Sequence, residues 1–254
     1  MKSLKIAKFQ ILDTIRPIGI FYGIFLIVIM FLAVSNVRSG GNISSSGIEM
    51  ASAVFLLIAG LNSFKSNFRF SQANNISRKA LFKGLILAVF PIAFAMSVID
   101  LIINRVYNVF VNCPTNFDTI YGSYRDTGMR DWNTGSFVWT QANDIYTLLS
   151  TIIWNFAVYS MIFLLGILIT LVYYRSNTIM KVIVSIIPTI VITLTYNIFT
   201  MLPASFRNSI GSFITGAFGW QSRNPYMAVL SFGVLGVIFT GLIYLLTKKA
   251  VVKE

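Results

Sequence analysis

Six long stretches of apolar residues dominate this 254-residue chain, and shorter polar segments separate them. Each stretch is long enough, or nearly so, to cross the hydrocarbon core of a bilayer as a helix. A backbone in lipid must satisfy its own hydrogen bonds, so we expect helices and not open strands. The pattern predicts a single-domain, all-α integral membrane protein over residues 1–254. The expected spans are Pro17–Val37, Gly47–Phe64, Gly84–Val106, Tyr146–Tyr174, Val182–Leu202 and Tyr226–Thr247.

The segment before the first span, residues 1–16, alternates basic and apolar residues. Leu4, Ala7, Ile11 and Ile15 fall on one helical stripe, whereas the basic side chains lie mostly away from it. We therefore expect an N-terminal interfacial helix that lies on the cytoplasmic leaflet. Pro17 stands where a new helix would start.

The basic residues gather on one side of the six spans. The net charge is +12, from 20 Lys and Arg against 8 Asp and Glu. With six spans both termini share one side, where most of the basic residues accompany only Asp13 and Glu254; the other side has no net charge. This asymmetry predicts that both termini are cytoplasmic. Because the positive charge is explained by membrane topology, we expect no nucleic-acid partner. The basic residues on that side are Lys2, Lys5, Lys8, Arg16, Lys65, Arg69, Arg78, Lys79, Lys83, Arg175, Lys181, Lys248, Lys249 and Lys253.

The segments expected outside the cell differ in character. Residues 107–145 form a long extracellular loop whose many aromatic residues favour a folded cap over a disordered linker. Residues 203–225 are apolar but too short to cross and return, and Ser205–Phe218 is expected to be a helix in the outer leaflet. Ser46 and Glu49 have the spacing of a capping box for the second span. The single cysteine, Cys113, cannot form an intrachain disulfide.

The cytoplasmic segment 65–83 is the longest inner connection. Its phenylalanines alternate with Lys65 and Arg69, Asn74 and Asn75 interrupt it, and Ser77 can cap the helix that follows. Aromatic residues beside cations are typical of a protein interface. Anchoring of the aromatic rings in lipid, with the bases setting topology, explains the same composition.

Several kinds of chemistry lose support from the sequence. There is no phosphate-binding P-loop motif, and there is no histidine at all. Only Asp100 is a candidate for a coupling acid within the spans, and Asn104 and Arg105 follow it on the same helix. We expect these three residues to form a polar patch that closes the outer end of the bundle. No catalytic residue and no metal site is expected on this chain.

The residues Ala73-Asn74-Asn75-Ile76-Ser77-Arg78-Lys79-Ala80-Leu81-Phe82-Lys83-Gly84 resemble the segment before the third helix of bacterial ABC-2-type permeases. Members of that family often carry an Ile-Ser-Arg-Lys pattern there, after a glycine or asparagine. Asn75 stands where glycine is common, and asparagine tolerates the left-handed conformation that such a turn uses. The layout of a basic N-terminal helix, six spans and an apolar outer segment is also similar, although the loop after the third span is longer here.

The resemblance implies a permease subunit of the bacterial plasma membrane that forms a homodimer and pairs with separate ABC ATPase subunits. ATP and Mg²⁺ would then bind the partner and not this chain. Size and loop plan look most similar to exporters of phenol-soluble modulins, which implies export of amphipathic or hydrophobic peptides or lipid-like compounds. The implied ATPase-coupling residues are Phe68, Arg69, Phe70, Asn74, Asn75, Arg78 and Lys79. Candidate residues lining a substrate cavity are Asn62, Thr193, Tyr196, Asn197 and Thr200, for which helix–helix hydrogen bonding is an equal explanation.

Two other classes of protein fit the same composition. A secondary carrier would work without an ATPase, but it usually needs acids near the middle of the membrane. A membrane scaffold or immunity protein would bind a toxin or a sensor and transport nothing.

Overall fold

A computed structural model of the chain describes residues 2–38, 45–122, 124–127, 139–177, 179–186, 193–194 and 201–248. These residues form helices joined by turns, and none of them belongs to a strand. Five long helices account for most of the described chain: α1 (Lys2–Arg38), α2 (Glu49–Ala73), α3 (Arg78–Tyr107), α6 (Ile145–Arg175) and α9 (Pro225–Lys248).

Four of the long helices, α1, α3, α6 and α9, are long and apolar enough to cross a membrane. They correspond to four of the six expected spans, so the chain is a helical protein of multi-pass character. Helix α2 covers the expected second span, but its second half carries polar residues such as Asn62 and Lys65. The expected fifth span, Val182–Leu202, lies largely outside the described residues.

Helix α1 differs from the expectation for the N-terminus. The structure has no separate helix over residues 1–16, because one helix of 37 residues runs through Pro17 to Arg38. At 1.5 Å per residue it is about 56 Å long, far more than the roughly 30 Å of a hydrocarbon core. Its first turns pack along the bundle: Ile6 is buried against Gly84 of α3. These contacts hold the segment in line with the rest of α1 despite the proline, and its place relative to the leaflet stays a prediction.

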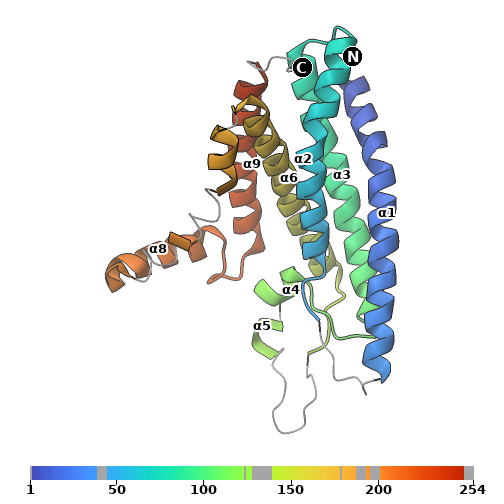
Figure 1. The fold of residues 1–254 in the computed structure, drawn as a ribbon. Helices are drawn as coiled ribbons and strands as arrows, with labels where there is room; N and C mark the ends of the chain where they lie inside the picture. Colours follow the sequence, from blue (N-terminus) through green and yellow to red (C-terminus); the bar gives the residue numbers. More distant parts are fainter. Residues whose placement is uncertain are drawn as a thin grey trace.

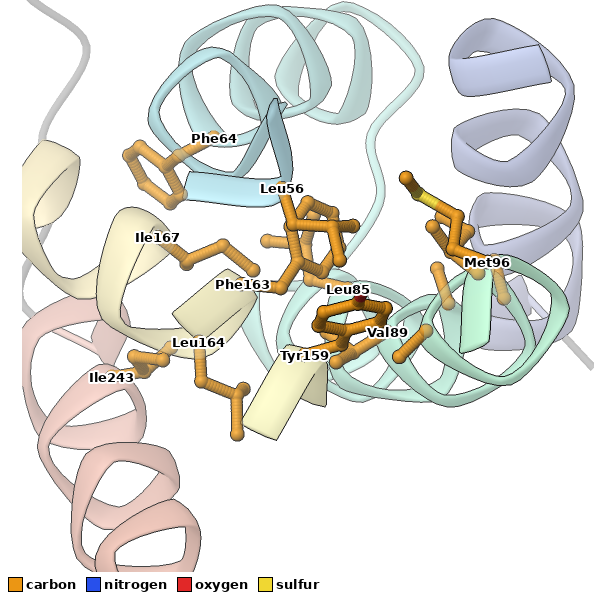
Figure 2. Close-up of a cluster of buried hydrophobic side chains, with 14 of the residues drawn as sticks. Leu56, Phe64, Leu85, Val89, Met96, Tyr159, Phe163, Leu164, Ile167 and Ile243 are labelled. Atoms are coloured by element: carbon orange, nitrogen blue, oxygen red, sulfur yellow. The ribbon is translucent and has the colours of Figure 1, made fainter. Parts of the chain in front are cut away.

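The core of the bundle forms around α6. This helix packs extensively on α2 and α9 and also contacts α3, and α1 attaches mainly through α3. Figure 2 shows the side chains that meet there: Leu56 and Phe64 from α2, Leu85 and Val89 from α3, and Phe163 and Ile167 from α6. Burial of this apolar surface holds α2, α3 and α6 together, and Ile243 adds α9 to the same cluster.

The turn between α2 and α3 follows the sequence signals closely. Ser77 caps α3, with its hydroxyl accepting from the backbone N–H of Ala80 at 3.3 Å. Asn75 has a φ of 50°, the left-handed conformation that the Asn-for-Gly substitution allows. The capping box expected at the start of α2 is wrong, because the helix begins after Ile48 with no side-chain cap and Glu49 is buried instead.

Short helices gather at the end of the bundle opposite the α2–α3 turn. α4 (Asn116–Ile120) and α5 (Tyr124–Thr127) belong to the long loop, and the Tyr121 hydroxyl donates to the carbonyl of Phe218. The described part of this loop is therefore packed against its neighbours; residues 128–138 lie outside the description. α8 (Ala204–Ala217) confirms the helix expected in the apolar segment. It has no buried residue and projects away from the bundle (Figure 1). Its place in the outer leaflet stays a prediction.

Candidate functional site

The two ends of the bundle differ strongly in charge. The N-terminal end of α1, the α2–α3 turn and the C-terminal ends of α6 and α9 share one end, at the top of Figure 1. Asp13 is the single acidic residue among the described residues of this end. The described basic residues there are Lys2, Lys5, Lys8, Arg16, Lys65, Arg69, Arg78, Lys79, Lys83, Arg175, Lys181 and Lys248, and all of them are exposed.

The α2–α3 hairpin carries all the residues that the resemblance associates with ATPase coupling, but it presents them differently. Arg69, Asn74, Asn75 and Lys79 are exposed at or near its tip. Phe70 is 41% exposed, and its ring stacks on Phe9 of α1 with a centroid distance of 4.6 Å. These side chains are available to a partner in solution.

Phe68 has a different environment from Phe70. It is fully buried, stacks on Phe64 at 5.3 Å and meets the ring of Tyr174 on α6 edge-on at 5.5 Å. Its side chain is therefore not available to a partner in this arrangement. Instead the two phenylalanines and Tyr174 fasten the hairpin to the end of α6.

Arg78 ties the start of α3 to the end of α9. One of its guanidinium nitrogens donates to the carbonyl oxygen of Lys248 at 2.8 Å. Arg78 also lines a pocket of about 330 Å³ between the two helices, together with Phe82 and Tyr244. Arg78 thus has a structural partner within the chain, whereas Lys79 remains free in the described part.

The hairpin is also joined to α1 by buried polar groups. Gln10 donates to the hydroxyl of Ser63 at 2.8 Å, and the amide of Asn67 donates to the side-chain oxygen of Gln10. All three residues are nearly inaccessible. Satisfied polar contacts between apolar helices fix their register, so α1 and α2 are locked together near the basic end.

The candidate cavity residues are only partly described. Asn62 lines a small pocket of about 130 Å³ between α1 and α2, beside Asp13 and Thr14. Its amide donates back to the carbonyl of Ile58 at 3.0 Å, which is a bond within the helix. Thr193 is exposed. Tyr196, Asn197 and Thr200 lie outside the described residues, so the proposed lining stays a prediction.

Asp100 is the point at which four helices meet, which the sequence did not reveal. Its carboxylate accepts from Tyr22 of α1 at 2.8 Å and from Ser52 of α2 at 2.9 Å. The Tyr159 hydroxyl of α6 donates to its other oxygen. Asp100 is 2% exposed. A carboxylate with three donors from three neighbouring helices is a structural junction.

Beyond Asp100, polar side chains seal the end of α3. The amide of Asn104 donates to the carbonyl of Cys113 at 3.0 Å, and Gln141 donates to the side-chain oxygen of Asn104 at 2.8 Å. Arg105 lies 3.6 Å from the carboxylate of Asp118 on α4. The expected polar patch at this end is thus present, although each of the three residues has partners from a different part of the chain.

Glu49 is the buried carboxylate among several buried polar side chains that lack a hydrogen-bond partner in the described residues. It is 2% exposed, and neither of its carboxylate oxygens has a hydrogen bond to the described residues.

No group of three or more acids, cysteines or histidines is placed to hold a metal ion in the described ranges. Comparisons with protein-family models, with characterised proteins and with solved structures give no match.

Proposed function

We propose that this chain is the transmembrane subunit of an ATP-driven exporter, with an exposed cytoplasmic hairpin that receives the motion of a separate ATPase. The observation that carries the proposal is the construction of the α2–α3 hairpin. Its tip is exposed and basic, while its base is fixed to α6 by Phe64, Phe68 and Tyr174. A force applied at the tip would therefore move α6 with the hairpin and would not be absorbed in a loose loop.

The course of the chain supports six spans. α6 and α9 run in the same direction. Ser150 near the start of α6 faces Tyr226 near the start of α9, and the end of α9 reaches Arg78 at the basic end, where α6 also ends. α6 ends at the basic end, and α9 begins at the opposite end (Figure 1). The chain leaves α6 at one end and enters α9 at the other, and the apolar stretch 182–202 is long enough to span a hydrocarbon core.

The proposed substrate class rests on the small number of charged residues in the spans and on the resemblance to peptide exporters. Amphipathic or hydrophobic peptides, or lipid-like compounds, would need a wide and mostly uncharged path. Such a path would lie between two copies of the chain in the bacterial plasma membrane, with both termini in the cytoplasm. The long apolar faces of α1 and α9, which are mostly exposed in the single chain, leave room for both lipid and a second copy.

Charge reversal at the hairpin tip tests the proposal. A variant with Arg69→Glu and Lys79→Glu should lose copurification of an ABC ATPase expressed with this chain. The difference from the wild type should shrink as salt rises, because salt screens both the wild-type attraction and the repulsion in the variant. Lys181→Glu, an exposed base at the same end but off the hairpin, is the matched control. If transport in vesicles proceeds without ATPase and follows an ion gradient, the chain is a secondary carrier. If no transport is measured with the ATPase bound, it is a scaffold.

A further inference from the structure

The outer halves of α1 and α3 line an apolar groove at the end of the bundle opposite the basic end. Its volume is about 720 Å³. Met30, Val34 and Val37 form one wall and Ile102, Val106 and Phe110 the other, and each of these side chains is more than half exposed. Such a concentration of exposed apolar side chains marks a surface that is covered in the native environment.

One charged residue lies in this lining, at the mouth of the groove. Arg38 belongs to the last turn of α1, is exposed and has no ion pair with the described residues. Arginine suits phosphate oxygens because its planar guanidinium donates to two of them at once. The groove therefore offers a cation at one end and only apolar surface along the rest.

The length of the groove fits one leaflet. Its lining on α1 extends from Leu26 to Val37, which is about 17 Å of helix at 1.5 Å per residue. Half of a hydrocarbon core is about 15 Å. With Arg38 at headgroup level, an acyl chain would lie along the whole groove and end near the middle of the bilayer.

We infer that the groove between α1 and α3 binds one phospholipid of the leaflet opposite the basic end, with its phosphate on Arg38 and an acyl chain between the two helices. Because Arg38 is not neutralised by an acid in the described chain, the site favours a lipid with net negative charge. A lipid in this position fills the outer side of the α1–α3 contact, where the Asn36 amide already donates to the carbonyl of Phe110 at 3.1 Å. This inference requires only that the chain lies in a membrane, and it does not depend on an ATPase or on transport.

Native mass spectrometry of the purified chain tests the site, with phosphatidylglycerol, phosphatidylcholine or inorganic phosphate added after delipidation. We expect one phosphatidylglycerol to bind, and Arg38→Gln to weaken that binding by about tenfold, the loss of one charge-assisted contact. Arg207→Gln on α8, remote from the groove, should not weaken it. Val34→Trp should fill the groove and abolish binding, whereas Ile24→Trp, on the exposed surface of α1 outside the groove, should not.

Three results would overturn the inference. The first is equal phosphatidylglycerol binding by Val34→Trp and Ile24→Trp variants. The second is inorganic phosphate binding with the same Arg38 dependence and no need for an acyl chain. The third is a chain dimer that Val34→Trp dissociates in the absence of lipid, because the groove would then hold a second copy of the protein.

Discussion

Gly60 of α2 and Gly166 of α6 face each other where their helices come closest. A Cβ atom built on either glycine would lie 3.0 Å from the Cα of the other, and nearer still to a carbonyl oxygen of the opposite helix. The contact continues one turn further, where the Thr170 hydroxyl of α6 donates to the carbonyl of Leu61. Small residues let helix backbones approach in this way inside a membrane.

Alanine at either glycine should therefore force α2 and α6 apart. We expect Gly60→Ala or Gly166→Ala to lower the free energy of unfolding by about 1–3 kcal/mol, as overpacking does in other cores. The double variant should cost less than the sum of the two, because the first methyl group already separates the helices. Unfolding in mixed micelles measures the change.

The control for this pair is a glycine with open space around it. A Cβ on Gly19 or Gly23 of α1 would meet nothing within 4 Å. Alanine at these positions should be neutral or stabilising by roughly 0.5–1 kcal/mol, because it restricts the unfolded chain. Loss of stability in Gly19→Ala equal to that in Gly60→Ala would show that the close crossing is not the cause.

Tyr159 should matter for stability through its bond to Asp100. Tyr159→Phe removes one of three donors to a buried carboxylate, so we expect a loss of about 1–3 kcal/mol in the free energy of unfolding. Tyr244→Phe is the matched control, since its ring packs on Phe82 at 5.2 Å and its hydroxyl has no hydrogen bond to the described residues. Equal unfolding midpoints for the two variants would argue against a junction at Asp100.

Cys113 should be unreactive in the folded protein. The thiol is fully buried, and burial raises its pKa to about 11. Because thiolate forms only as the pH rises through the pKa, about one thiol in a thousand is ionised at pH 8. A maleimide should label the native protein slowly and the unfolded protein fast. Rapid labelling at pH 8 in native micelles would contradict the buried position.

The orientation of the bundle can be tested at two exposed positions. In a Cys113→Ala background, a cysteine at Val109, which is 78% exposed, should react with an impermeant maleimide added to intact cells. A cysteine at Asn74 should react only after lysis, because the basic end is expected inside. Ser71, in the last turn of α2, is unsuitable as a reporter because it is fully buried. Labelling of Asn74→Cys in intact cells would show that the orientation is opposite to the one expected.

The long helices were predictable because their apolar stretches and local caps carry strong signals. Ser77 and Asn75 define the α2–α3 turn through their own backbone preferences, so the sequence alone could place it. Pro17 misled the prediction for α1, because the contacts of Ile6 and Gln10 with other helices outweigh the local effect of a proline. Tertiary packing of this kind is not visible in a window of residues.

The α2–α3 hairpin was predictable in position, but the surroundings of its side chains were not. The alternation of phenylalanine and basic residues located the hairpin, yet on a helix Phe68 and Phe70 point to different sides, and only packing decides which side is buried. The Asp100 junction was missed because Tyr22, Ser52 and Tyr159 are distant in sequence. Gly60 and Gly166 gave a signal that could have been used, since each interrupts an otherwise bulky apolar run.

Substitution of the two phenylalanines should separate folding from coupling. Phe68→Ala removes a fully buried ring from the contact with Tyr174, so we expect a loss of about 3–5 kcal/mol in the free energy of unfolding. Phe70→Ala removes only the stack on Phe9, about 0.5–1.5 kcal/mol, and should leave the bundle folded.

If the hairpin receives an ATPase, Phe70→Ala should weaken ATPase copurification and substrate-stimulated ATP hydrolysis while the folded fraction stays near that of the wild type. The Phe9→Ala variant exposes the same face of Phe70 without removing its ring, and so it should retain the ATPase. A Phe70→Ala chain that binds its ATPase and transports like the wild type would mean that this ring serves only to hold α2 against α1.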